Sequence, residues 1–287
     1  MKATPENLIF KGGGVLGVAY AGAITALEQH YRLQDVKRVA GTSSGAIFAS
    51  LVCLGYNAHE IQGIAREIDF KGFGSHWNPL RLFTKYGIYS GDKFLYWIKA
   101  KIKCKTGCSE STFQDLMDAG MKEIKLFATD LNTRKIQEFS YGQTPDIKLA
   151  EALRASMSVP LFFNAWQFPD GKPNNHIFVD GGVLYCYPIT CFGEDLTKTI
   201  GFYLYNTIKE DSNLKYGHLS KYMGQLFKTM EDAQDVDFEK DQQLKAATVQ
   251  INDFGISPTD LKITTAQKDK LIEIGYTATI QYFEGQS

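Results

Sequence analysis

The sequence of 287 residues predicts a three-layer α/β/α fold with a mainly parallel central sheet. Near the N-terminus, two β-prone runs are each followed by a glycine-framed turn and then by an apolar helical pattern, which is the order typical of parallel α/β proteins. Much later, a third β-prone run ends in an acid followed by two glycines. Because α/β sheets gather their functional groups at the carboxyl ends of the strands, we expect the three turns to meet at one edge of the sheet.

The first turn is the glycine run Gly12–Gly17 (GGGVLG), which lies between a strand predicted over 8–10 and a helix predicted over 18–30. Amides at such a helix N-terminus bind anions, either a phosphate or the oxyanion of an acyl-transfer reaction. Three of these glycines also satisfy the GxGxxG spacing of a dinucleotide-binding loop. The acid expected about 20 residues further on has only Asp35 as a candidate, which disfavours that alternative.

The second turn, Gly41-Thr42-Ser43-Ser44-Gly45, follows a strand predicted over 36–40 and precedes a helix predicted over 44–54. The pattern GxSxG in this position is typical of a nucleophile elbow, in which the serine hydroxyl is forced outward. Gly41 and Gly45 flank the serine because a Cβ atom would collide in so tight a turn. The alternative is a polar loop, but the flanking strand and helix favour a nucleophile.

The third turn begins at Asp180, at the end of a strand predicted over 176–180. Gly181 and Gly182 allow the chain to turn at once, so the carboxylate is expected at the carboxyl edge of the sheet. Taken alone, Asp-Gly-Gly is most often an ordinary turn, because Asp caps its own backbone and Gly accepts a positive φ.

The three motifs, in this order, resemble those of the patatin-like phospholipase family, and the resemblance covers nearly the whole chain. Residues 155–163 look like the family segment ahead of the catalytic acid, and 128–133 look like its central strand and turn. Residues 253–256 and 270–276 are similar to its closing strand and helix. One departure is Leu16, which stands where the family usually has Arg or Lys.

The resemblance implies a serine acyl hydrolase with a Ser-Asp dyad, in which Ser43 is the nucleophile and Asp180 takes its proton. Its substrates would be fatty acyl esters of membrane phospholipids, as in a phospholipase A or a lysophospholipase. We expect no cofactor and no metal, because no cluster of carboxylates or of His and Cys residues has the spacing of a calcium or zinc site. The amides expected to form the oxyanion hole are those of Gly12, Gly13, Gly14 and Ser44.

A conventional Ser-Asp-His triad is the mechanistic alternative, since Ser43, Asp180 and His218 occur in the required order. In that fold several strands precede the elbow, and the stretch before Ser43 is too short to form them. The sequence therefore favours the dyad.

Composition limits the other classes of function. The chain has 31 basic and 32 acidic residues, so no global field attracts nucleic acid. No run is apolar and long enough for a signal or a membrane-spanning helix, and five cysteines fit a reducing compartment, so we expect a cytoplasmic protein. A zinc site is disfavoured because the usual C-x2-C spacing is absent from its four candidates, Cys104, Cys108, Cys186 and Cys191. Without a linker, residues 1–287 are expected to form one domain.

One segment has the composition of a membrane-contacting surface. Residues 70–103 combine aromatic and basic side chains, which indicates either peripheral contact with lipid or a core helix whose lysines reach solvent. The acidic run between 231 and 241 is interpreted as a solvated helix face.

Three further interpretations remain open at the level of sequence. The chain could be a non-catalytic lipid-binding relative, for which Leu16 is the only hint. It could be a phospholipase effector, in bacterial defence or injected into a host cell, that is switched on by a partner or ligand. An activating partner or a homo-oligomer is compatible with the family resemblance.

Overall fold

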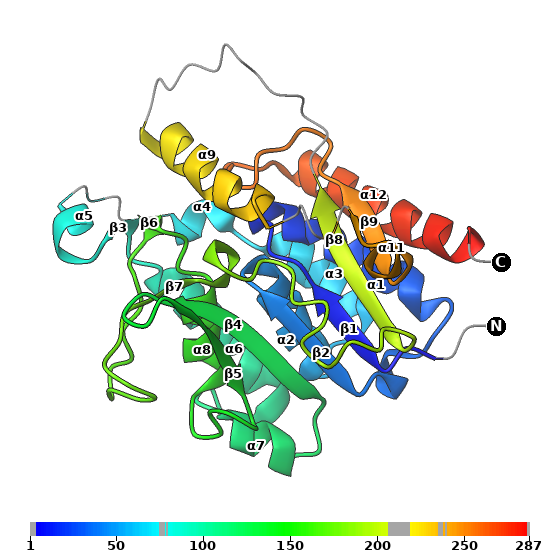
Figure 1. The fold of residues 1–287 in the computed structure, drawn as a ribbon, viewed down its shortest axis with the longest axis horizontal. Helices are drawn as coiled ribbons and strands as arrows, with labels where there is room; N and C mark the ends of the chain where they lie inside the picture. The colour runs from blue at the N-terminus through cyan, green and yellow to red at the C-terminus, as the bar shows by residue number, and fades with distance from the viewer. Residues whose placement is uncertain are drawn as a thin grey trace.

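The computed structural model describes residues 4–74, 78, 80–205, 219–234, 238 and 240–285. Its centre is a seven-stranded sheet in the order β5-β4-β2-β1-β8-β9, with β7 also paired to β4 (Figure 1). The strands are β1 (Asn7–Phe10), β2 (Arg38–Thr42), β4 (Glu123–Asp130), β5 (Lys135–Ser140), β7 (Phe178–Asp180), β8 (Thr199–Tyr205) and β9 (Thr248–Asn252).

Most of the strand pairs are parallel, which confirms the predicted α/β fold. β1 lies parallel to β2 and to β8, and the pairs β2–β4 and β8–β9 are parallel as well. β5 and β7 both run antiparallel to β4. A separate small sheet pairs β3 (Gly87–Tyr89) with β6 (Leu161–Phe163) in parallel.

The helices flank this sheet. They are α1 (Ala19–Glu28), α2 (Ser44–Cys53), α3 (Ala58–Glu67), α4 (Phe70–Phe73), α5 (Arg81–Thr84), α6 (Asp92–Thr106), α7 (Phe113–Asp118), α8 (Leu149–Ser156), α9 (Leu219–Asp232), α11 (Gln242–Ala246) and α12 (Thr265–Glu284). Short 3-10 turns occur at η1 (Gly14–Val18), η2 (Leu33–Asp35) and η3 (Gly181–Val183).

The two faces of the sheet bury different amounts of side chain. Leu8 and Phe10 of β1 point into the main core, against which α2 and α8 pack, and all residues of α2 are buried. Ile9, between them, points to the opposite face, where a smaller cluster with Phe127 is covered by side chains from 185–196 and from α11. This alternation follows from the two-residue period of a strand.

Two assignments made from sequence, one of a helix and one of a strand, change in the structure. The helix predicted over 18–30 begins as η1 and continues as α1, because the glycine run bends the chain before regular helix starts. The closing strand is β9, at 248–252, so the assignment of 253–256 to a strand is wrong. There the chain turns, with Phe254 and Gly255 at positive φ, which a strand does not allow.

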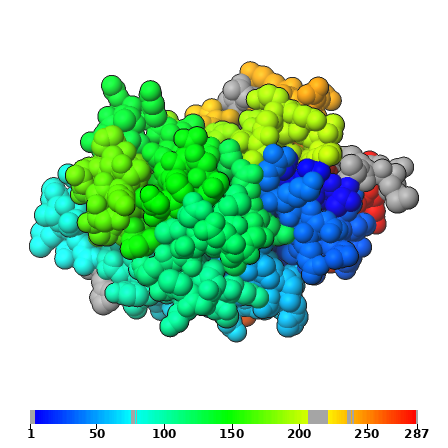
Figure 2. All heavy atoms as spheres, turned by 90° about the horizontal axis from the view of Figure 1, so that it is seen from below, coloured from blue at the N-terminus to red at the C-terminus, as the bar shows by residue number. Residues whose placement is uncertain are grey.

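The basic, aromatic segment 70–103 divides into two parts. Helix α6 buries Phe94, Ile98 and Ile102 at helical spacing, so one of its faces packs into the core, while Tyr96 on another face is exposed. Its lysines lie at the margin, where Lys99 and Lys105 form ion pairs with acids of neighbouring segments. By contrast, α5 projects at one end of the molecule, where both Figure 1 and the space-filling view show it (Figure 2).

Candidate active site

Ser43 stands on the sharp turn between β2 and α2. Its backbone has a φ of 54° and a ψ of −127°, a strained conformation for a residue with a side chain. A Cβ at Gly41 would overlap the backbone of Gly45, and a Cβ at Gly45 would overlap the carbonyl oxygen of Phe10. The Ser43 N–H donates to Ser156 Oγ at 2.9 Å, which helps to hold the turn. Both flanking glycines are therefore needed for this geometry.

Asp180 reaches the elbow from the end of β7. The pairing of β7 and β2 with the same strand, β4, brings the two segments together. Ser43 Oγ donates to Asp180 Oδ2 at 2.6 Å, and the N–H of Gly182 donates to Asp180 Oδ1 at 2.7 Å. Gly181 and Gly182 begin η3 and are buried, so the turn predicted after Asp180 lies within the site. The structure thus places a serine hydroxyl directly on a carboxylate.

The surroundings of Asp180 make its carboxyl a stronger base than an exposed aspartate. Its side chain is fully buried, and burial raises the pKa of Asp180 to about 8. The hydrogen bonds from Ser43 and Gly182 favour the charged form and limit the increase, whereas the nearby carboxylate of Glu231 adds to it. A carboxyl with this pKa can accept a proton near neutral pH.

The glycine loop and the elbow both contain backbone N–H groups without an acceptor within the described ranges. Among hydrogen bonds between described residues, the N–H groups of Gly13, Gly14 and Ser44 donate none. Gly14, at a φ of +56°, lines the same cavity as Ser43. The N–H of Gly12 instead donates to the carbonyl oxygen of Cys186 at 3.0 Å, so the expectation that Gly12 supplies an oxyanion donor is wrong.

A narrow, largely apolar cavity adjoins Ser43. Its volume is about 50 Å³, room for about one or two water molecules. The Ser43 side chain is itself only 2% exposed, with Met157 Sδ 3.8 Å from its Oγ. The wall is rich in aromatic side chains, namely Phe70, Phe73, Phe162, Phe163 and Phe227. In this conformation an ester substrate cannot reach the hydroxyl.

Helix α9 supplies site residues that the sequence analysis missed. Phe227 and Glu231 line the cavity, and Gln234, just after the helix, donates to the carbonyl oxygen of Gly182 at 2.7 Å. Glu231 is 6% exposed and accepts from Cys186 Sγ at 3.2 Å, so its assignment to a solvated face is wrong. No local motif identifies these residues, because only packing places α9 over a turn about 50 positions earlier in the chain.

Histidine does not contact Ser43 in the part of the chain that the structure describes. His176 Nδ1 lies 2.7 Å from Asp130 Oδ2, a pair that does not include the elbow serine. His218, the triad candidate, lies outside the described residues. The alternative zinc site is not assembled, since no group of three or more metal-ligating side chains occurs among the described residues.

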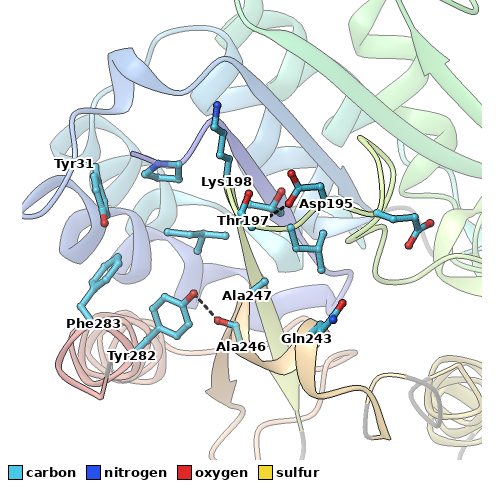
Figure 3. Close-up of a pocket in the computed structure, with 14 residues that line it drawn as sticks. Tyr31, Asp195, Thr197, Lys198, Gln243, Ala246, Ala247, Tyr282 and Phe283 are labelled. Atoms are coloured by element: carbon cyan, nitrogen blue, oxygen red, sulfur yellow. Dashed lines mark hydrogen bonds between the residues drawn. The ribbon is translucent and has the colours of Figure 1, made fainter. Parts of the chain in front are cut away.

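A larger cavity, of about 630 Å³, lies at the amino ends of the strands (Figure 3). It is bordered by Lys198 and Thr199, at the start of β8, and by Tyr282 and Phe283 of α12. Tyr282 donates to the carbonyl oxygen of Ala246 across its rim. Since Ser43 follows the carboxyl end of β2, this cavity is separate from the candidate active site.

Fold and site together define an α/β protein in which the serine of a nucleophile elbow donates a hydrogen bond to a buried aspartate. The family model for patatin-like phospholipases matches residues 8–191, and the chain belongs to this family, as the motifs predicted. It is 31% identical to YqhO of Bacillus subtilis over 289 residues, 94% of this chain and 95% of that protein.

Two further similarities concern a viral protein and a solved structure. The chain is 24% identical over 194 residues to the probable lipid hydrolase 463L of Invertebrate iridescent virus 6, covering 64% of this chain and 62% of that one. The crystal structure of VipD from Legionella pneumophila has a TM-score of 0.66 and 16% identity, over 99% of this chain and 67% of that one. VipD thus shares the fold. Within the described residues, no helix has the length and apolar character needed to cross a bilayer.

Proposed function

We propose that this protein is a serine acyl hydrolase that cleaves fatty acyl esters of membrane phospholipids, of the phospholipase A or lysophospholipase type. The observation that carries the proposal is the 2.6 Å hydrogen bond from Ser43 Oγ to the buried carboxylate of Asp180. Family membership, the name of the viral relative and the aromatic cavity beside Ser43 all support a lipid substrate. We also propose that residues 1–287 form one catalytic domain, since Ser43 and Asp180 come from strands of the same sheet.

In the proposed mechanism, Ser43 Oγ attacks the ester carbonyl carbon while Asp180 takes its proton. The N–H groups of Gly13, Gly14 and Ser44 stabilise the negative charge on the former carbonyl oxygen. Collapse of this tetrahedral species breaks the ester bond, and the leaving alcohol receives the proton from Asp180. Water then attacks the acyl-enzyme, again with Asp180 as base. The bond from the acyl carbon to Ser43 Oγ breaks, the fatty acid leaves and Asp180 returns the proton to Ser43 Oγ.

Labelling with a fluorophosphonate probe tests the nucleophile. We expect the wild type to be labelled once and to hydrolyse phospholipid vesicles, and Ser43→Ala to do neither. Ser50→Ala is the matched control, because Ser50 is a buried serine about two turns further along α2 and outside the cavity. Labelling that persists in Ser43→Ala would contradict the assignment.

Two other outcomes of the same experiment separate the alternatives. A wild type that binds vesicles without labelling or hydrolysis would support a non-catalytic lipid-binding relative. A wild type that is labelled but hydrolyses no lipid would support an effector that needs an activating partner or ligand.

The closed cavity requires a movement before substrate can bind, and we propose that α9 moves. Its Phe227 and Glu231 form part of the wall, and a Cβ at Gly224 of the same helix would lie 3.5 Å from Cβ of Thr259 in the facing loop. That separation suits a disulfide.

The double variant Gly224→Cys/Thr259→Cys is therefore expected to lose vesicle hydrolysis when oxidised and to recover it when reduced. Each single variant, and the wild type under the same oxidant, should stay active. Full activity in a protein shown by mass spectrometry to be cross-linked would rule out movement of α9 as the route of access.

A further inference from the structure

The short helix α5 carries large apolar side chains into solvent. In the segment 80–86, which we call the α5 tip, Leu80 is 70% exposed, Phe83 is 83% exposed and Tyr86 is 54% exposed. Leu80 and Phe83 are three residues apart and so share one side of the helical turn. Exposed apolar groups gathered in this way on an otherwise well-packed protein indicate a surface that something covers.

The α5 tip is held in its exposed position by backbone hydrogen bonds. The N–H of Asn78 donates to the carbonyl oxygen of Ile88 at 3.1 Å, and the N–H of Ala165 donates to the carbonyl oxygen of Lys85 at 3.1 Å. These bonds close the base of the tip and attach it to the chain after β6. The side chains are therefore presented by a fixed support.

That support connects the tip to the candidate active site. Directly after the tip, β3 pairs with β6, so that Tyr89 lies opposite Phe163. Phe162 and Phe163 of β6 are part of the cavity wall beside Ser43. One strand pair thus separates the exposed tip from the cavity in which an acyl chain would have to bind, and both views place the tip at one end of the molecule (Figures 1 and 2).

The tip's own sequence is basic, which favours an anionic partner. Residues 78–91 contain Arg81 and Lys85 and no acid, although the whole chain has a net charge of −1. Aromatic and apolar side chains next to basic ones are typical of surfaces that enter the headgroup region of an anionic bilayer.

The size of the tip argues against a protein partner. Large aromatic side chains bury about 150–250 Å² each, so three side chains fall short of the roughly 800 Å² per partner of a stable protein interface. A bilayer needs no such area, since it accepts a few projecting side chains.

We propose that the α5 tip docks the protein on anionic lipid surfaces and so brings the Ser43 cavity close to the bilayer. This inference rests on the proposed function for its purpose, but binding can be measured without any hydrolysis. It also narrows the surface expected from sequence, residues 70–103, to the α5 tip, because α6 packs one of its faces into the core.

Co-sedimentation with vesicles of phosphatidylcholine, with or without phosphatidylglycerol, tests the proposal. For Leu80→Ser/Phe83→Ser we expect binding to the mixed vesicles to fall by about tenfold or more. Arg81→Gln/Lys85→Gln should weaken binding to the mixed vesicles only, and added salt should abolish the difference from wild type. The matched control is Leu131→Ser/Ile136→Ser on the β4–β5 hairpin, where these side chains are 47% and 44% exposed, and it should bind like wild type.

Hydrolysis of a soluble short-chain ester separates this inference from the proposed function. All tip variants should retain the wild-type rate on that ester while losing activity on vesicles. If neither the wild type nor any variant cleaves an ester, the proposed function fails, but the vesicle-binding result still tests the docking proposal. Equal vesicle binding by wild type and Leu80→Ser/Phe83→Ser would overturn the inference, as would a change of oligomeric mass in that variant, which would identify a second copy as the occupant.

Discussion

Replacing Asp180 by Asn is expected to lower kcat by about 10²- to 10⁴-fold, the contribution of a positioned general base. The amide cannot take the proton from Ser43 Oγ, which in the wild type lies 2.6 Å from Asp180 Oδ2. The elbow itself should persist, because its geometry depends on Gly41 and Gly45. Steady-state hydrolysis of a soluble ester, alongside fluorophosphonate labelling, measures the effect.

Asp130→Asn is the matched control for this experiment. Asp130 is also a buried aspartate at the end of a strand, but its carboxylate accepts from His176 and lies outside the cavity. Its replacement should leave kcat nearly unchanged. His218→Ala distinguishes dyad from triad: a loss as severe as that of Asp180→Asn would show that a histidine mediates the proton transfer.

The activity should rise with pH up to about pH 8. Burial raises the pKa of Asp180 to about 8, so below that pH the carboxyl is mostly protonated and cannot act as base. Between pH 6 and pH 8 we expect kcat/KM for a non-ionising ester to increase by about 50-fold, approaching tenfold per unit at the acid end. Above this range the profile should level off.

The variant Glu231→Gln tests whether the Glu231 carboxylate raises the pKa of Asp180. The Glu231 carboxylate raises the pKa of Asp180, so its neutralisation should move the rising part of the profile to lower pH. A control with Asp232→Asn, on the exposed side of the same helix, should leave the profile in place. A flat wild-type profile between pH 6 and pH 8 would show that Asp180 is already ionised in the reacting enzyme, as an opened, hydrated cavity would cause.

The sequence predicted the three turns because their requirements are local. GxSxG needs glycine on both sides of Ser43, and the structure shows that a Cβ at either position would strike backbone. The alternation of strand and helix patterns likewise predicted a mainly parallel sheet, and that sheet brings Ser43 and Asp180 to one edge although 137 positions separate them. Motif order and family resemblance therefore sufficed for the fold and for the candidate pair.

Only tertiary packing determines which segment covers Ser43 and Asp180. Met223 and Phe227 of α9 show an apolar face with a spacing of four residues, and Glu231 continues that spacing. The sequence alone predicts that a glutamate at this position is exposed to solvent. It is buried because α9 packs against the turn after Asp180. Another long-range contact engages the N–H of Gly12 with Cys186, and the folded chain buries Asp180 enough to raise its pKa. Local patterns thus determine which residues can form the site, whereas burial, and with it the strength of the base, depends on segments that meet only in the folded chain.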